Sequence, residues 1–166
     1  MSVTPDQDLI SILDRIAIFG GLELGQQQKL LHMMDEKTYS DGEVIFRKGE
    51  SGSCIYIVID GRVALDFEQD DHPLSDLRLH PGACFGETSV IGVQPHAATT
   101  RAEGKTRVLA LPSSSLYQLY ETDLPLFASV ILNFAREASR RLHATDELFL
   151  QTSKMQELKK KGFSGF

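Results

Sequence analysis

Residues 85–101, FGETSVIGVQPHAATTR, combine types that suit a pocket for a small anionic ligand. Gly86 favours a tight turn, and the ETSVIG stretch that begins at Glu87 is long enough for one or two helical turns. Backbone N–H groups at the start of a helix are unpaired and carry the positive end of the helix dipole. Glu87 adds a carboxylate that accepts a hydrogen bond from a sugar hydroxyl. The pattern therefore predicts a phosphate-binding turn with an acceptor for an attached sugar.

The same residues also have a simpler structural interpretation. A carboxylate in the first turn of a helix suits the helix dipole even when it faces solvent, so Glu87 alone does not decide between the two roles. The AATT run at residues 97–100 is small enough for a ligand to approach the backbone, but it also suits the edge of a strand. Local sequence leaves both interpretations open.

Length, charge and cysteine content narrow the class of protein. The 166 residues suit one domain, and 23 acidic against 17 basic residues give a net charge of −6, which disfavours binding to nucleic acid. The first residues carry no basic stretch followed by an apolar core, and no run of roughly 18 apolar residues occurs, so we expect neither export nor membrane insertion. We expect a cytoplasmic protein in which Cys54 and Cys84 are reduced core thiols.

Three zones of different composition follow one another along the chain. Residues 1–36 repeat apolar residues at helical spacing around Gly20 and Gly21, which predicts two short helices with a glycine joint. Residues 37–112 predict a small antiparallel β-roll of jelly-roll type, with strand candidates at residues 44–47, 54–59, 62–67, 77–80, 98–102 and 106–111. Within this zone the Asp60-Gly61 pair is the strongest hairpin signal. The expected fold class is α+β, in one domain.

Residues 113–166 return to a helical pattern. A short helix is expected after the three serines at 113–115, which suit an N-cap, and a long helix is expected from about Leu124 to Lys161 because no glycine or proline interrupts it after Pro125. Apolar and small residues recur along the long helix at alternating three- and four-residue spacing, at 131, 134 or 135, 138, 142, 145, 149 and 152. This seam favours a partner helix and hence a homodimer. The alternative is that the first half packs on the roll.

Catalytic and metal-binding patterns are missing from the sequence. The four histidines other than His96 include no pair at metal-ligand spacing, and no nucleophile elbow, phosphate-binding loop lysine or zinc-helix motif occurs. We therefore expect a protein that is not an enzyme and that has neither a metal nor a resident cofactor.

Taken together, six blocks of the sequence resemble the cyclic nucleotide-binding domain of the bacterial catabolite-activator family and its relatives in kinases and channels. The resemblance covers roughly residues 18–147, through FGGL, GEVIFRKGESGSCIYIVIDGRV, LHPGACFGE, PHAATTRA, LALP and ASRRLHATDE in the family's order. It implies a β-roll, a phosphate-binding cassette at residues 85–101 made of a short helix and loop, and a long C-terminal helix that closes over the base.

The resemblance also implies the site residues. Gly86 and the following amides, including that of Thr88, would face the sugar-phosphate, and Glu87 would accept from the ribose 2′-hydroxyl. Ala97, followed by Ala98, would offer a backbone amide to the phosphate. On the long helix, Thr145 and Asp146 would meet the purine.

His96 departs from the family, which is expected to carry an arginine there. An arginine is permanently charged and holds phosphate oxygens through a fork of donors, whereas histidine is shorter and mostly neutral at pH 7. The loss of one charge-assisted hydrogen bond costs about 1.5–3 kcal/mol, or roughly tenfold to more than a hundredfold in affinity. We therefore expect weakened binding of cyclic AMP unless acidification charges His96.

Two functions follow. In the first, the domain is a sensor that binds cyclic AMP, cyclic GMP or a related phosphate compound and signals through its long helix to an unidentified downstream protein. In the second, it is a degenerate member of the fold that does not bind nucleotide and acts by dimerisation or docking. The bacterial relatives read DNA with a helix-turn-helix after the long helix, and the roughly five residues after Lys161 are too few for one, so no direct contact with DNA is expected.

Overall fold

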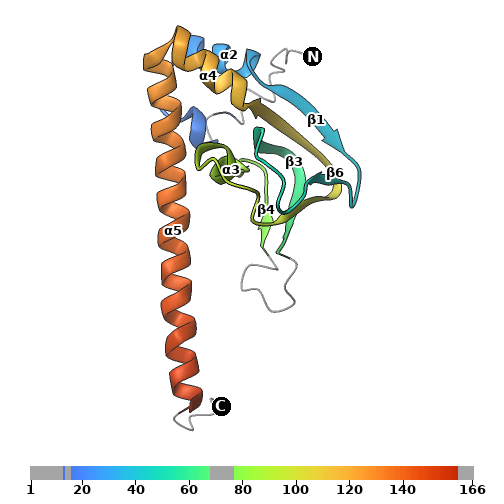
Figure 1. Ribbon diagram of the computed structural model, residues 1–166, viewed down its shortest axis with the longest axis vertical. Coiled ribbons are helices and arrows are strands. Elements are labelled where there is room, and N and C mark those ends of the chain that lie inside the picture. The colour runs from blue at the N-terminus through green and yellow to red at the C-terminus, as the bar shows by residue number, and fades with distance from the viewer. Residues whose placement is uncertain (1–12, 14–15, 68–76, 161–166) are drawn as a thin grey trace.

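The computed structural model describes residue 13 and residues 16–67 and 77–160. Short helices precede an antiparallel sheet, and one long helix runs along the side of the roll and continues beyond it (Figure 1). In chain order the elements are η1 Ala17–Phe19, α2 Leu24–His32, β1 Asp35–Tyr39, β2 Val44–Phe46, β3 Cys54–Asp66, β4 Arg78–Leu79, β5 Cys84–Phe85, α3 Glu87–Ile91, β6 Thr99–Pro112, α4 Ser113–Thr122 and α5 Leu124–Lys160.

Two long strands, β3 and β6, form the centre of the sheet. They pair antiparallel from Cys54 opposite Pro112 to Asp66 opposite Thr99. The shorter strands β1 and β2 pair with β6, and β4 and β5 pair with β3, all antiparallel. The predicted antiparallel roll is therefore confirmed, together with the long C-terminal helix.

The hairpin predicted at Asp60-Gly61 is wrong. Strand β3 runs through both residues, and its register against β6 shifts on either side of Asp60. Gly61 has a φ of +82°, and a Cβ there would lie 2.6 Å from the carbonyl oxygen of Lys105. The glycine therefore allows a bulge in a long strand rather than a chain reversal, because β6 offers a pairing partner on both sides of it. Gly104, which stands between the strand candidates at residues 98–102 and 106–111, likewise lies inside β6, with a φ of +72°.

The N-terminal zone is only partly helical. Helix α2 ends at His32, and β1 begins at Asp35, inside the zone expected to be helical. Three of the five β1 residues are exposed, so the strand has no apolar alternation by which the sequence could reveal it. Most of the first predicted helix lies outside the described residues.

The two C-terminal helices follow the prediction closely in extent. Helix α4 spans Ser113–Thr122, but its N-cap is Pro112, without a side-chain cap hydrogen bond, so the serines form the first turn and the predicted serine N-cap is wrong. Helix α5 begins at Leu124 and continues to Lys160.

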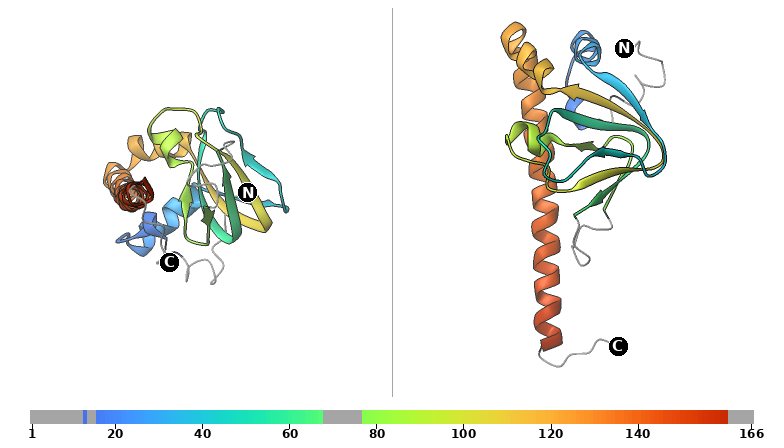
Figure 2. Two further views of the ribbon diagram at one scale, coloured as in Figure 1. Left: turned by 90° about the horizontal axis from the view of Figure 1, so that it is seen from below. Right: turned by 45° about the vertical axis from the view of Figure 1, so that its right-hand side comes forward.

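The first half of α5 packs against the N-terminal segment. Phe134 is 1% exposed, and the side-chain amide of Asn133 donates to the carbonyl oxygens of Ile18 at 3.0 Å and Gly20 at 2.9 Å. Farther along, Leu142 and Phe149 are 63% and 70% exposed. The C-terminal part of α5 extends past the roll (Figure 2). The packing alternative thus describes the first half of the helix.

Three further properties bear on function. No helix in the described part of the chain is long and apolar enough to cross a membrane. The described residues also contain no group of three histidine, cysteine, aspartate or glutamate side chains placed to hold a metal ion. Cys54 and Cys84 are free thiols, half-buried and buried respectively.

Candidate functional site

Gly86 and α3 form the turn and short helix that the sequence predicted. Gly86 is the N-cap of α3 and adopts left-handed backbone geometry, with a φ of +81°. A Cβ at this position would lie 3.0 Å from the carbonyl oxygen of Cys54. Backbone conformation and close packing therefore both favour glycine here.

A cavity of about 140 Å³ lies between α3, the start of β6 and the neighbouring strands, and we call it the cassette cavity. It collects six of the eight predicted site residues. Its lining is Phe46, Leu65, Phe67, Phe85, Gly86, Glu87, Thr88, Ser89, His96, Ala97, Ala98, Thr100 and Arg141. The fold therefore assembles most of the predicted phosphate and sugar contacts around one small space.

Glu87 is buried at 4% exposure, so the interpretation of it as a solvent-facing carboxylate is wrong. Its Oε1 accepts a hydrogen bond from Arg141 Nη1 at 2.6 Å, and Arg141 Nη1 also donates to the carbonyl oxygen of Cys84 at 3.2 Å. Burial raises the pKa of Glu87 above its ordinary value, and Arg141 opposes that rise. The second carboxylate oxygen, Oε2, is buried without a partner among the described residues.

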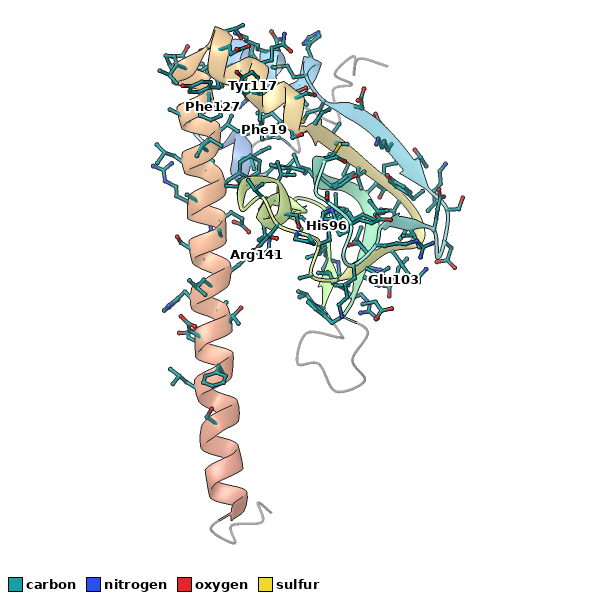
Figure 3. The ribbon with its side chains drawn as sticks, viewed as in Figure 1. Phe19, His96, Glu103, Tyr117, Phe127 and Arg141 are labelled. Carbon is teal, nitrogen blue, oxygen red and sulfur yellow. The ribbon has the colours of Figure 1, made fainter. Side chains whose placement is uncertain are left out.

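Arg141 is the main site residue that the sequence reasoning missed. It reaches from α5 toward the side of the roll on which His96 lies (Figure 3), and it pairs with a residue 54 positions earlier in the chain. One signal was available, because Arg141 stands four residues before the predicted contact Thr145 and so lies on the same face of the helix. An acidic partner for it could not be chosen from sequence.

His96 is buried at 5% exposure and contributes a flat ring to the cavity wall. The ring stacks on Phe46, with centroids 3.7 Å apart and planes 11° from parallel. Its backbone is held by Glu50, whose carbonyl oxygen accepts from His96 N at 2.9 Å, and by Gly49, whose N donates to His96 O at 2.8 Å. Burial lowers the pKa of His96, while the nearby Glu50 carboxylate opposes the shift. The ring is therefore neutral at pH 7.

The two site residues predicted on the long helix, Thr145 and Asp146, do not line the cassette cavity. Thr145 lines a second cavity of about 350 Å³ between α5 and the β4–β5 region, which we call the helix cavity; its lining is Leu77, Leu79, Ala83, Cys84, Glu137, Arg141, Ala144 and Thr145. The Thr145 hydroxyl donates to the carbonyl oxygen of Arg141 at 2.9 Å. Asp146 is exposed and is not among the residues that line either cavity. Arg141 lines both cavities and so marks the boundary between them.

Some polar groups of the residues that line the cassette cavity have hydrogen-bond partners, and others have none among the described residues. The cavity holds one carboxylate and one guanidinium, already paired with each other, and a neutral imidazole. Besides Glu87 Oε2, the hydroxyl of Thr100 is buried without a hydrogen-bond partner among the described residues. A buried polar atom without a partner costs about 1–3 kcal/mol. Two residues that line one small cavity thus each carry such an atom, which indicates a place where a polar ligand gains binding energy.

The sequence matches the family described as "Cyclic nucleotide-binding domain" over residues 36–123, more than half of the chain. The chain belongs to the cyclic nucleotide-binding domain family. The matched range runs from β1 to the end of α4 and holds the cassette residues, whereas Arg141 and the rest of α5 lie beyond it.

Members of the family with known roles are similar to this domain in sequence and fold. A cAMP-dependent protein kinase regulatory subunit of Dictyostelium discoideum is 31% identical over 103 residues, which are 60% of this chain and 32% of that protein. The mouse cyclic nucleotide-gated channel alpha-4 is 31% identical over 115 residues, covering 69% of this chain and 19% of the channel. The catabolite activator protein of Thermus thermophilus has a similar structure, with a TM-score of 0.70 and 30% identity over 82% of this chain and 63% of that one.

The matched part of this chain thus covers only 32% and 19% of the length of those two relatives. One of these relatives is a kinase regulatory subunit and the other is a gated channel. Family membership therefore identifies the type of domain, and the function of this chain must be inferred from its site.

Proposed function

We propose that this domain is a non-catalytic regulatory sensor that binds a cyclic nucleotide, cyclic AMP or cyclic GMP, or a related phosphate ligand, and signals through α5. The observation that carries the proposal is Glu87 Oε2, a buried carboxylate oxygen that has no partner among the described residues and belongs to a side chain lining the cassette cavity. A ligand hydroxyl would donate to it and remove an unsatisfied acceptor, which is the role expected for a ribose 2′-hydroxyl.

The two cavities suit the two ends of a nucleotide. The cassette cavity is small and carries the polar groups, so it would take the sugar-phosphate, with the backbone near Gly86 and Ala97 facing the phosphate. The helix cavity is lined by Leu77, Leu79 and Ala144 and would take the flatter, less polar base beside Thr145. Arg141 stands between them, where it would contact a ligand that spans both.

The Glu87–Arg141 pair gives the ligand a direct connection to α5. A ligand hydroxyl that bonds to the Glu87 carboxylate would weaken the Glu87–Arg141 ion pair, which joins α3 to α5 in the described part of the chain. Binding would then alter how firmly α5 is held against the roll. In this proposal the downstream protein reads the position or the oligomeric state of that helix.

Homodimerisation through α5 forms part of the same proposal. Leu142 and Phe149 are both more than 60% exposed and stand seven residues apart, so they lie on one face of the helix. That face extends beyond the roll, where a second copy of the helix can reach it (Figure 1). A cytoplasmic location completes the proposal and is supported by the two free cysteines.

Isothermal titration calorimetry tests the binding step. Wild-type protein should bind cyclic AMP or cyclic GMP more tightly at pH 6 than at pH 7.5, and Glu87→Gln should weaken binding about tenfold because the amide accepts a hydrogen bond less well than a carboxylate. Glu121→Gln on the exposed surface of α4 is the control and should bind as wild type does. Binding that is unaffected by Glu87→Gln would remove the assigned role of the carboxylate.

A degenerate, ligand-independent domain is the second candidate, and His96 favours it. The ring stacks on Phe46 and is neutral, so the cavity offers a phosphate no cation other than Arg141, which is already paired. No heat of binding at millimolar nucleotide at either pH would favour this candidate. His96→Arg would restore nucleotide binding if the pocket lacks only a cation. It would not restore binding if other ligand contacts are missing as well.

A further inference from the structure

Thr100 stands out among the buried hydroxyl groups of the roll. It lies in β6 between Phe46 of β2 and Leu65 of β3, its cross-strand partners, and is 1% exposed. The adjacent Thr99 uses its hydroxyl to accept from Lys48 N at 3.1 Å. Thr106, farther along the strand and also buried, donates its hydroxyl to the carbonyl oxygen of Arg62 at 2.9 Å. Thr100 Oγ1 has no partner among the described residues.

The position of this hydroxyl links it to the cassette cavity. Thr100 lines that cavity, and its partner Phe46 is also the ring on which His96 stacks. Phe46 is therefore the cross-strand partner of one polar residue of the cavity and the stacking partner of the other. The other unsatisfied atom, Oε2, belongs to Glu87, which lines the same cavity.

The two unsatisfied atoms differ in the hydrogen bonds that they can make. A carboxylate oxygen only accepts, whereas a threonine hydroxyl both donates and accepts. A ligand that satisfies both must present a hydroxyl to Glu87 and an acceptor oxygen to Thr100. A sugar carrying a phosphate presents both kinds of group within a few bonds, and a purely apolar or purely anionic ligand does not.

We infer that Thr100 is a specificity-determining ligand contact, whose hydroxyl donates to an acceptor oxygen of the sugar-phosphate part of the ligand. It supplies a neutral hydrogen bond in a cavity whose imidazole carries no charge. This inference rests on the proposed function, since it names a further contact in the same cavity.

Thr100→Val and Thr100→Ser provide the test, with cyclic AMP and cyclic GMP as probes. Valine keeps the shape and removes the unsatisfied hydroxyl, so the ligand-free protein should melt about 2–4 °C higher while its affinity falls about five- to tenfold. Serine retains the hydroxyl and should keep affinity within about threefold of wild type. A gain in stability with a loss of affinity is not expected of a residue that serves only the fold.

Thr106→Val is the matched control. It removes a hydroxyl that is buried and already bonded, so it should lower the melting temperature and leave affinity unchanged, because Thr106 does not line the cavity. Unchanged affinity in Thr100→Val would overturn the inference, because it is the result expected if the hydroxyl bonds only to water. So would a fall in both affinity and melting temperature, which indicates a structural role.

The design separates this inference from the proposed function. If wild-type protein binds neither probe, the proposed function fails for those ligands, and the Thr100 variants are then compared in the His96→Arg background. A loss of affinity on Thr100→Val in that background would still support the contact. Absence of binding in His96→Arg as well would overturn both.

Discussion

Arg141 Nη1 lies 2.6 Å from Glu87 Oε1, so a side chain of α5 closes on the first residue of the cassette helix. The Glu87 side chain is 6% exposed and that of Arg141 is 39% exposed, which makes the pair asymmetric. Removal of the arginine leaves a buried charge without compensation, whereas removal of the glutamate leaves a guanidinium that water can reach.

Arg141→Met tests the structural part of this pair. Methionine keeps much of the apolar length but no charge, so unfolding free energy at pH 7 should fall by about 1–2 kcal/mol as Glu87 loses its counter-charge. Arg140→Met is the control, because Arg140 pairs with Glu137 at the surface and should cost less than about 0.5 kcal/mol. Urea unfolding measures both, and equal losses would show that the Glu87–Arg141 pair is no more important than a surface pair.

The raised pKa of Glu87 predicts the sign of a pH effect on stability. A carboxyl whose pKa is raised on folding binds more protons in the folded state, so its favourable contribution is full below the ordinary value of 4.5 and is lost as pH rises through the folded value. The stability of wild type relative to Glu87→Gln should therefore decline as the pH rises above the ordinary value of 4.5. Chemical unfolding of both proteins across this range provides the measurement, and a relative stability that rises with pH would contradict it.

His96 predicts a pH effect on stability of the opposite sign, below pH 6.5. Burial lowers its pKa, so its contribution is full above the ordinary value of 6.5 and is lost as pH falls toward the folded value. Stability relative to His96→Gln should thus fall as pH drops from 6.5. The charged groups near the ring are the Glu50 carboxylate, which favours protonation, and the paired Glu87 and Arg141 that line the same cavity.

Binding of an anionic ligand should reverse that shift at His96. A phosphate beside the ring favours the charged imidazolium, so binding near pH 6.5 is expected to take up a proton. Titration in two buffers with different ionisation enthalpies measures this uptake directly. Identical observed heats in the two buffers, once binding is established, would mean that His96 does not titrate with the ligand.

Gly86→Ala should damage the turn that begins the cassette. The new Cβ would combine a positive φ with a 3.0 Å approach to the carbonyl oxygen of Cys54, so we expect a loss of about 2 kcal/mol or more. Gly42→Ala is the matched control, since Gly42 has a φ of +73° but no atom within 4 Å of the added Cβ, and it should cost only about 1 kcal/mol. Thermal unfolding compares the two, and a larger effect at Gly42 would show that the close packing around Gly86 adds nothing.

Phe149→Glu should abolish the proposed dimer without unfolding the domain. Phe149 is 70% exposed in the single chain, so a charge there costs little unless a second helix covers it. Leu124→Glu, at 57% exposure near the start of the same helix, is the control and should leave association unchanged. Sedimentation velocity at high micromolar concentration measures the oligomeric state. A monomeric wild type would contradict the proposed dimer.

Much of the fold was predictable because the responsible signals are local. Gly86 followed by Glu87 indicated the turn and helix α3, and the absence of breakers after Pro125 indicated α5. These features depend on backbone preferences of neighbouring residues. The same local reasoning failed at Asp60-Gly61, where the pairing of β3 with β6 converts a hairpin signal into a bulge.

The sequence by itself determined that a cassette turn exists, that a carboxylate follows it, and that a histidine stands where a cation is expected. Tertiary structure decided that Glu87 is buried and paired with Arg141, that His96 stacks on Phe46, and that the Thr100 hydroxyl finds no partner among the described residues. The physical reason is that burial and pairing depend on segments far apart in the chain, brought together by the β3–β6 sheet and by α5 packing on the roll. Residue types set which bonds are available, and only the packed fold sets which of them are made.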